Sequence, residues 1–121
     1  MPARLGRAIP VLRIFDLAKA REFYVDWLHF AVDWEGRPFA DAPLYMQVSR
    51  GDCVLHLSEH YGDGTPGSGV MVETQGVDAL CAELQGYKYY RPHVEDAPWG
   101  ARIMTVLDPF GNRITFSERK A

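Results

Sequence analysis

Two short segments of this chain repeat one pattern. Residues 55–59 read Leu-His-Leu-Ser-Glu and residues 114–118 read Ile-Thr-Phe-Ser-Glu, 59 positions apart (114 − 55). The strand-like stretches around Ile9 and Gly69 are separated by about the same interval, and each begins a strand, helix, three-strand order. We interpret this as an internal duplication of a βαβββ unit. One such unit leaves a sheet face bare, so the units, or two chains, must pack around a concave surface suited to a small molecule.

The first unit covers about residues 7–59. Pro10 cannot donate to a sheet ladder, so its strand must lie at an edge or bend there. Asp16 is a good helix N-cap, and apolar residues at helical spacing follow it. Alternation predicts that Phe30, Val32 and Trp34 share one side of the next strand. The predicted elements are a strand over 7–15, a helix over 17–28, and strands over 30–35, 44–49 and 53–58.

The second unit covers about residues 69–118 and follows a glycine-rich loop over 60–68. Its last element is a hairpin, because Asp108-Pro109-Phe110-Gly111-Asn112 is a turn sequence between two alternating apolar runs. The predicted elements are a strand over 69–74, a helix from 77 that ends at Gly86, a strand over 87–94 interrupted by Pro92, and hairpin strands over 101–107 and 113–118.

Length and composition indicate one globular domain over residues 1–121. A net charge of −3 argues against a nucleic-acid partner, whose phosphates require clustered Lys and Arg. No apolar run approaches the ~20 residues of a membrane span, so no membrane partner is expected. Cys53 and Cys81 match neither a disulfide framework nor a zinc motif, which favours buried thiols in the cytoplasm.

Four segments carry a resemblance to a known family: Ala8-Ile9-Pro10-Val11-Leu12, the run from Asp16 through Glu22-Phe23-Tyr24 to Leu28, Pro98-Trp99-Gly100, and the Asp108 to Asn112 turn. In this order they resemble the vicinal oxygen chelate superfamily (glyoxalase fold), and most of all its bleomycin resistance proteins. The resemblance implies an α+β fold of two βαβββ modules whose curved mixed sheets enclose a cleft. It also implies a homodimer that exchanges its N-terminal strand, which here would cross to the partner before Pro10.

Enzymes of that superfamily hold a divalent metal on four strand positions, which fall here at Ile9, His56, Gly69 and Thr115. Only His56 is a good ligand, and a metal site needs three to four. We therefore expect no metal, no cofactor and no catalytic residue. The resemblance then implies antibiotic resistance by binding, in which a bleomycin-like ligand is sequestered unaltered in the dimer clefts.

Six residues are the candidate ligand-binding set: Trp34, Phe39, His56, Ser58, Trp99 and Thr115. Trp99 is either a plug at the sheet edge or an aromatic wall for a flat heterocycle, and the resemblance favours the wall. Trp34 and Phe39 stand where the family has cleft aromatics, although each could also be core. His56 and Ser58 should face away from Leu55 and Leu57, and a surface or internally satisfied histidine is the competing interpretation.

Three further patterns stay open or are set aside. Residues 56–60 read His-Leu-Ser-Glu-His, but this resembles a zinc motif only on a helix, and here it lies on a strand. The carboxylates available for a cationic ligand are Asp33, Glu35, Asp41, Glu59 and Asp63, with none preferred. His29 stands where a helix C-terminal glycine is usual, so it must take left-handed geometry or the turn is rebuilt.

Two alternatives to drug sequestration remain. One is a metal-dependent lyase or dioxygenase of the same superfamily, which would need His56 together with His60, Glu59 or His93. The other is a housekeeping ligand-binding protein that shares the fold.

Overall fold

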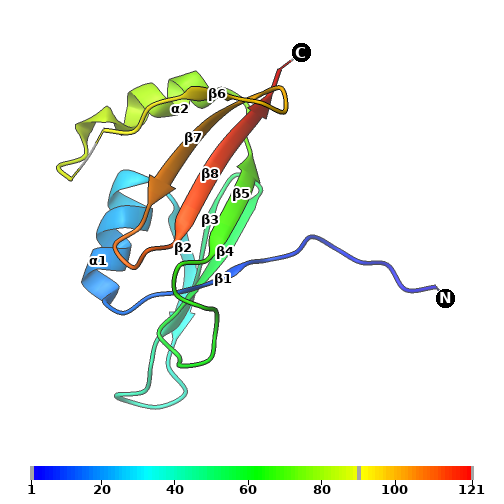
Figure 1. Cartoon of the computed structure of the whole chain (residues 1–121). Coiled ribbons are helices and arrows are strands. Elements are labelled where there is room, and N and C mark those ends of the chain that lie inside the picture. Colours follow the sequence, from blue (N-terminus) through cyan, green and yellow to red (C-terminus); the bar gives the residue numbers. More distant parts are fainter. Residues whose placement is uncertain (1, 90, 121) are drawn as a thin grey trace.

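The computed structural model describes residues 2–89 and 91–120, and it has two four-stranded sheets with helical segments between and beside them (Figure 1). Strand order is β1-β4-β3-β2 in the first sheet, which we call sheet A, and β5-β8-β7-β6 in the second, sheet B. This is the predicted α+β architecture of two βαβββ modules. Within the described residues, no helix is long and apolar enough to cross a membrane.

Sheet A belongs to the first module. Its elements are β1 (Val11–Arg13), the helix α1 (Leu17–Arg21) with a π-helical continuation η1 (Glu22–Trp27), β2 (Ala31–Gly36), β3 (Tyr45–Arg50) and β4 (Cys53–Ser58). Sheet B belongs to the second module. Its elements are β5 (Gly69–Glu73), the helix α2 (Val77–Glu83) with a 3-10 turn η2 (Leu84–Gly86), β6 (Glu95–Ala97), β7 (Ala101–Leu107) and β8 (Arg113–Arg119).

The two modules recognised as a repeat in the sequence have the same pattern of strand pairing in the structure. In each module the first and last strands are parallel neighbours and the other pairings are antiparallel. Val11 pairs with His56 in sheet A, and Met71 pairs with Thr115 in sheet B. The predicted hairpin is β7 and β8, which pair from Ala101–Arg119 to Leu107–Arg113.

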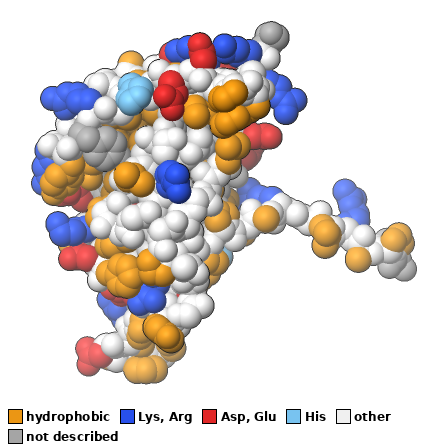
Figure 2. Space-filling model, viewed as in Figure 1, with side chains coloured by type: hydrophobic (Ala, Val, Ile, Leu, Met, Phe, Trp, Pro, Cys, Tyr) orange, Lys and Arg blue, Asp and Glu red, His pale blue; other side chains and the backbone are white. Residues whose placement is uncertain are grey.

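One predicted strand is wrong in extent, and another does not form. The first is only three residues long, and residues 2–9 are exposed and lead away from the body as an arm (Figures 1 and 2). Pro10, which has no N–H to donate, stands where the strand begins. The strand predicted over 87–94 is absent from its described residues, and Tyr90 lies outside them. Instead a short strand, β6, forms just after it.

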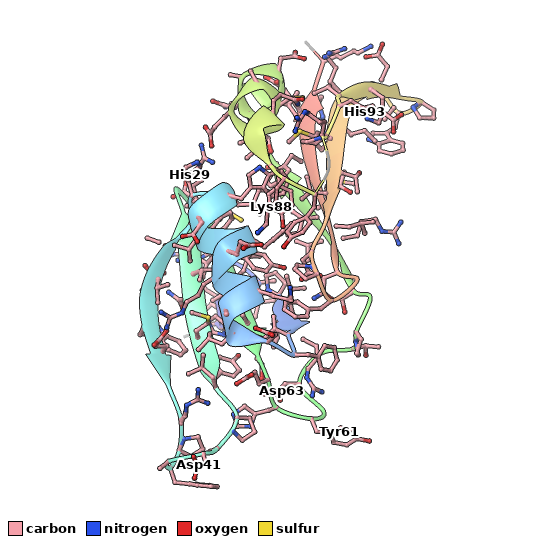
Figure 3. All side chains as sticks on the ribbon, turned by 90° about the vertical axis from the view of Figure 1, so that its left-hand side faces the viewer. His29, Asp41, Tyr61, Asp63, Lys88 and His93 are labelled. Carbon is pink, nitrogen blue, oxygen red and sulfur yellow. The ribbon has the colours of Figure 1, made fainter. Side chains whose placement is uncertain are left out.

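The first helix spans the predicted residues but changes its winding. Asp16 is its N-cap, accepting a hydrogen bond from the Lys19 N–H at 3.0 Å. In the second half the Leu28 N–H bonds to the Phe23 carbonyl, five residues earlier, which is the spacing of a π-helix. His29 then takes φ 60°, the left-handed geometry that was one of its two alternatives, at the exit towards β2 (Figure 3).

The hydrophobic core is shared by both modules. Phe23, Tyr24 and Trp27 on the first helix are buried against apolar residues of both sheets, and the Trp27 ring stacks on Tyr87 at 4.1 Å between centroids. The Trp27 indole N–H donates to the Leu84 carbonyl at 3.0 Å. Trp27 and Phe23 are therefore core residues.

A buried polar network ties the β7–β8 turn to the first module. The Asp108 carboxylate accepts from the backbone N–H groups of Phe110 and Asn112, from the Asn112 side-chain amide, and from the Tyr24 hydroxyl at 2.6 Å. The Asn112 amide also donates to the Arg13 carbonyl at 2.8 Å and accepts from the Ser68 N–H at 3.2 Å. Three other segments thus meet at this one turn.

Gly64 brings the loop over 59–68 against β1. A Cβ at Gly64 would lie 2.6 Å from the Val11 carbonyl oxygen, and its φ is +70°. Gly67, in the same loop, has φ +86° but nothing within 4 Å of its Cβ position. Only glycine fits at 64 for both reasons, because a side chain would meet backbone there.

We predict that Tyr24→Phe lowers the free energy of unfolding by roughly 1.5–3 kcal/mol, because it leaves one buried acceptor position of Asp108 without its donor. The matched control is Tyr61→Phe, since Tyr61 is 96% exposed. Urea unfolding followed by fluorescence measures both variants. Equal stability of the two would contradict a role for this hydroxyl in joining the modules.

We also predict that Gly64→Ala destabilises the protein by about 1–3 kcal/mol more than Gly67→Ala. Both substitutions carry the strain of a positive φ, and only the first adds a clash with backbone. Thermal or urea unfolding of the pair separates the two effects. An equal loss at both positions would show that the loop moves away from β1 without penalty.

Candidate functional site

An aromatic patch lies on the open face of sheet A, opposite the core. The Trp34 and Tyr45 rings are nearly parallel, 9° apart with centroids 5.9 Å apart. The His56 ring stands edge-on to both, at 5.4 Å from Trp34 and 5.2 Å from Tyr45. Three neighbouring strands supply one ring each. The structure therefore brings together two of the predicted site residues, Trp34 and His56, and adds Tyr45.

A β-bulge puts Trp34 on this face. The pairing register of β2 with β3 shifts between Val32 and Trp34, so Asp33 is an extra residue. The predicted alternation of Phe30, Val32 and Trp34 is therefore wrong: Phe30 is in the core, whereas Trp34 stacks on Tyr45. Asp33 is hydrogen-bonded to side chains of the same face as Trp34.

Hydrogen bonds run in one direction across the patch. The Gln47 amide nitrogen donates to Asp33 at 3.0 Å, which leaves the Gln47 oxygen as an acceptor for His56 Nε2 at 2.9 Å. His56 Nδ1 then accepts from the Tyr45 hydroxyl at 2.7 Å. Every donor in this series of hydrogen bonds meets an acceptor when the His56 imidazole is neutral and carries its proton on Nε2.

Two pKa shifts agree with this direction. Hydrogen bonds from Gln47, and secondarily from Ser49, lower the pKa of Asp33, so the series of hydrogen bonds ends on the ionised Asp33 carboxylate. Burial, and secondarily the Asp63 carboxylate, raises the pKa of Tyr45, so its hydroxyl keeps the proton that it donates.

The patch does not suit a metal ion. His56 uses one ring nitrogen as a donor and the lone pair of the other for Tyr45, so a metal would have to displace Tyr45 or Gln47. His56 pairs with Val11 rather than with Ile9, and Thr115 pairs with Met71 rather than with Gly69. Val11, Ile9, Met71 and Gly69 all lack a carboxylate, imidazole or thiolate that could bind a metal. Among the described residues, no group of three or more His, Cys, Asp or Glu side chains is placed to hold a metal.

The alternative ligand set for a metal enzyme is also dispersed. His93 lies at the opposite end of the molecule from Asp63, which shares the 59–68 loop with His60 (Figure 3). Glu59 accepts from the Leu44 N–H at 3.0 Å and faces Arg37 at 3.6 Å. Histidines 56, 60 and 93 therefore do not converge within one chain.

Ser58 is fully buried beneath the loop that follows β4. Its hydroxyl donates to Asp63 at 3.0 Å and accepts from the His60 N–H at 3.0 Å. Both capacities of the hydroxyl are used to fasten the loop, and Asp63 is held close to Tyr45 as a result. Ser58 thus supports the patch from below and does not reach its surface.

The other predicted site residues lie elsewhere. Trp99, 62% exposed, precedes β7 and lines an open groove of about 1730 Å³ between the β3–β4 turn and sheet B. Thr115 is on the outer face of β8, its hydroxyl 3.1 Å from that of Thr105. Phe39 is 68% exposed in the 37–44 loop. One chain therefore does not bring Trp99 and Thr115 together with Trp34 and His56.

Sequence reasoning missed Tyr45 and Gln47, and it named Asp33 only as one of five available carboxylates, without preferring it. A signal for the first two was present, because the strand Tyr45–Arg50 alternates with core residues Met46 and Val48 and so turns Tyr45 and Gln47 towards His56. No comparable signal marks Asp33, since its orientation depends on the bulge.

Comparison with known proteins agrees with this fold. A family model for glyoxalase superfamily proteins matches residues 3–121. The chain belongs to the glyoxalase superfamily. No curated protein sequence matches it significantly.

Three solved structures resemble the chain over 97% or more of its length. The bleomycin-binding protein of bleomycin-producing Streptomyces verticillus, solved with copper(II)-bleomycin, is 32% identical, with 100% of this chain and 99% of that chain covered and a TM-score of 0.69. TnmS3, an antibiotic binding protein from Streptomyces sp. CB03234, is 24% identical, with 98% and 100% covered and a TM-score of 0.72. The bleomycin resistance determinant encoded on transposon Tn5 is 22% identical, with 97% and 100% covered and a TM-score of 0.72. The last two likenesses show the fold alone.

We predict that Tyr45→Phe changes the tautomer of His56 without unfolding the protein. Nδ1 loses its donor, whereas the Trp34–Tyr45 ring contact is kept. Long-range 1H–15N spectra report which ring nitrogen carries the proton. The wild type should show His56 protonated on Nε2, and Tyr45→Phe a mixture of tautomers. The same Nε2 signature in both proteins would mean that Gln47 alone sets the tautomer.

Proposed function

We propose that this protein sequesters a bleomycin-type or other aromatic, basic drug in clefts of a homodimer and does not alter it chemically. The observation that carries the proposal is the full-length likeness, at 32% identity, to a protein whose structure holds copper(II)-bleomycin. The patch of Trp34, Tyr45 and His56 gives a surface for the flat part of such a ligand. Ring stacking there contributes roughly 0.5–1.5 kcal/mol beyond burial of area.

A dimer would bring the two halves of the candidate site together. The open face of sheet A carries Trp34 and His56, and the outer face of sheet B carries Thr115 and the exposed Met71. If sheet A of one copy faces sheet B of another, each cleft has an aromatic, polar wall and a more apolar wall. Trp99 would then lie at the margin of that cleft, and Phe39 on a loop that can close over its end.

The charges suit a cationic ligand. Asp33 lies on the patch and stays ionised because its neighbours donate to it, and a cation near an aromatic face is further stabilised. Of the remaining carboxylates, Glu35 is paired with Arg21 and Glu59 with Arg37, so they are already neutralised in part. Asp33 is therefore the acidic residue that we assign to the ligand.

The donor set supports binding over catalysis. A metal-assisted lyase or dioxygenase needs several convergent ligands and an open coordination position. Here the single histidine at the strand positions is engaged through both nitrogens. The free thiols of Cys53 and Cys81 suit a reducing compartment, and we assign the protein to the cytoplasm.

We predict that isothermal titration of the purified protein with bleomycin gives a micromolar or tighter dissociation constant, about −8 kcal/mol, with one ligand per subunit. Affinity weaker than about millimolar, −4 kcal/mol, would contradict sequestration and favour a different ligand for the same fold. Recovery of chemically unchanged bleomycin, by mass spectrometry, tests the absence of catalysis.

Alanine variants locate the binding surface in the same titration. Trp34→Ala and Trp99→Ala should each weaken binding tenfold or more, because each removes an exposed stacking ring. Tyr61→Ala is the matched control, since it removes an exposed ring from the 59–68 loop. Unchanged affinity for Trp99→Ala would return Trp99 to a purely structural role at the sheet edge.

A further inference from the structure

The hydrogen-bonded series across the aromatic patch contains one histidine, His56. Histidine side chains change charge between about pH 8 and 5. The two ends of the series keep their charge in this range. Hydrogen bonds from Gln47 and Ser49 lower the pKa of Asp33, which stays ionised. Burial raises the pKa of Tyr45, which keeps its proton. The His56 ring is half-buried, so water can deliver a second proton to it.

A second proton on His56 reverses one hydrogen bond. Nδ1 of the neutral ring accepts from the Tyr45 hydroxyl at 2.7 Å, and Nε2 donates to the Gln47 oxygen at 2.9 Å. Nε2 keeps its proton in the imidazolium, so the bond to Gln47 is unchanged. Nδ1 becomes a donor, because both ring nitrogens of a protonated histidine carry a proton. Tyr45 must then turn its own proton away from His56 and accept.

This reversal changes what Tyr45 presents to a ligand. Beside the neutral ring, Tyr45 directs its proton to His56, and its oxygen offers a lone pair to other groups. Beside the imidazolium, the O–H of Tyr45 is directed elsewhere and is a donor to other groups. A positive charge then also lies next to Trp34, whose ring centroid is 5.4 Å from that of His56. The first state suits a bound cation, and the second repels one.

The elements around His56 differ in the charge that they bring to it. The titratable and charged side chains on this face are Asp33 on β2, Tyr45 on β3, Arg13 on β1, and His60 and Asp63 on the 59–68 loop. The fixed cation, Arg13, is outnumbered by two carboxylates and lies over the Phe15 ring at 4.7 Å. An imidazolium at His56 is therefore not surrounded by like charge. His60 is the second histidine nearby, its ring 6.3 Å from that of Tyr45.

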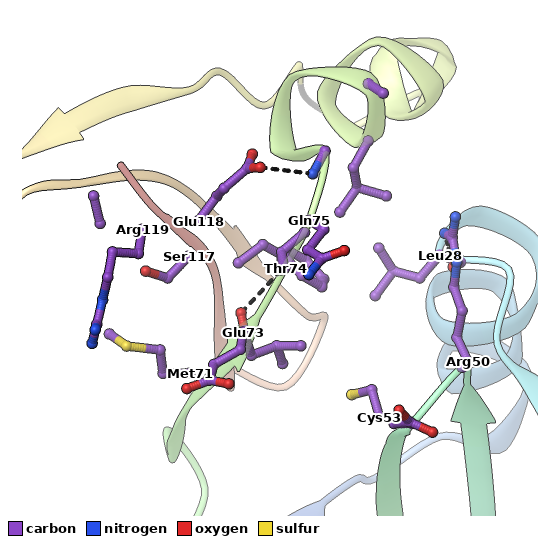
Figure 4. A pocket seen from close by; sticks show the side chains of 18 of the residues that line it. Leu28, Arg50, Cys53, Met71, Glu73, Thr74, Gln75, Ser117, Glu118 and Arg119 are labelled. Atoms are coloured by element: carbon purple, nitrogen blue, oxygen red, sulfur yellow. Dashed lines mark hydrogen bonds between the residues drawn. The ribbon is translucent and has the colours of Figure 1, made fainter. Parts of the chain in front are cut away.

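The groove beside Trp99 has no comparable group. Among the described residues that line it there is no histidine, and Figure 4 shows arginines, glutamates and Cys53 there. Burial raises the pKa of the Cys53 thiol, and hydrogen bonds from the Val77 and Gly76 N–H groups lower the pKa of Glu118. Cys53 and Glu118 therefore keep their charge between about pH 8 and 5. A response to pH in this range distinguishes the patch from the groove.

We propose that a second proton on His56 switches the patch from holding cations to repelling them, by reversing the hydrogen bond between His56 and Tyr45. The switch rests on the proposed function in one respect, that the ligand is cationic and lies on the patch. It goes further, because it makes retention of that ligand depend on pH. A cationic drug is held at neutral pH and released in mild acid.

Spectra of the ligand-free protein test the reversal without any drug. Long-range 1H–15N spectra follow both nitrogens of His56 between about pH 8 and 5, and the 13C signal of Tyr45 Cζ follows the state of its hydroxyl. The two should change with one midpoint. Tyr61 is the matched control, since it is 96% exposed, and its Cζ signal should stay constant. A constant Tyr45 Cζ signal while His56 gains its proton overturns the proposal, and so does a His56 ring that stays neutral throughout.

Titration with bleomycin tests the effect on binding. Between about pH 8 and 5 the affinity of the wild type should fall roughly tenfold or more relative to that of His56→Gln, because only the wild type places a new positive charge beside the ligand. Protonation of the drug itself is common to both proteins, so their difference belongs to His56. Parallel curves for the two proteins overturn the proposal.

His60→Gln is the matched control in this titration, and its affinity should fall as steeply as that of the wild type. A flat response in His60→Gln would assign the switch to His60 and overturn the proposal. The proposed function and the switch can fail separately. Absence of bleomycin binding at about pH 8 contradicts sequestration, whereas the ligand-free spectra decide the reversal by themselves. Tight binding with one affinity at every pH contradicts the switch and leaves sequestration intact.

Discussion

The buried Asp108 carboxylate holds the rest of the structure in register. It accepts four hydrogen bonds, two of them from the backbone of its own turn, one from the Asn112 side chain and one from Tyr24 on the first helix. Asn112 extends the same network to the Arg13 carbonyl at the end of β1 and to the Ser68 N–H just before β5. A buried polar group is expensive unless every partner is present, so this turn fits only one arrangement of the two modules. The hydrogen bonds at this turn therefore also set how the open faces of the two sheets lie relative to each other.

Much of this fold could be predicted because the sequence repeats locally strong signals. The Asp16 cap, the turn around Pro109 and the alternating runs of β4 and β8 are each decided within a few residues. The failures depend on distant contacts. The N-terminal segment looks like a strand as far back as residue 7, yet β4 gives it a partner only from Val11. The π-helical winding of residues 22–27 likewise has no sequence signal, because it follows from how Phe23, Tyr24 and Trp27 pack between two sheets.

The candidate site shows the same division. Aromatic and polar residues on β3 and β4 could be assigned to one face by alternation, but a single extra residue in β2 reverses the face of Trp34 and places Asp33 beside it. The bulge also explains how the polar groups of the patch are used. Gln47 and His56 hydrogen-bond to each other. Gln47 also bonds to Asp33, and His56 also bonds to Tyr45. What the patch then leaves exposed is ring surface and one carboxylate, and our proposal of a flat, cationic ligand rests on this combination.

The two sheets share one plan of strand order, but their outer faces differ. His56 and Thr115 occupy equivalent strand positions, yet the first belongs to a hydrogen-bonded aromatic patch and the second to a small hydroxyl pair with Thr105. The glutamates that end the repeated pattern diverged too. Glu59 fastens the start of β3, whereas Glu118 accepts from the Val77 and Gly76 N–H groups at the start of α2, and these bonds lower its pKa. His56 and Thr115, by contrast, are each hydrogen-bonded to neighbouring strands of their own module. Binding of a ligand between these unlike faces is the function that we propose for the pair of sheets.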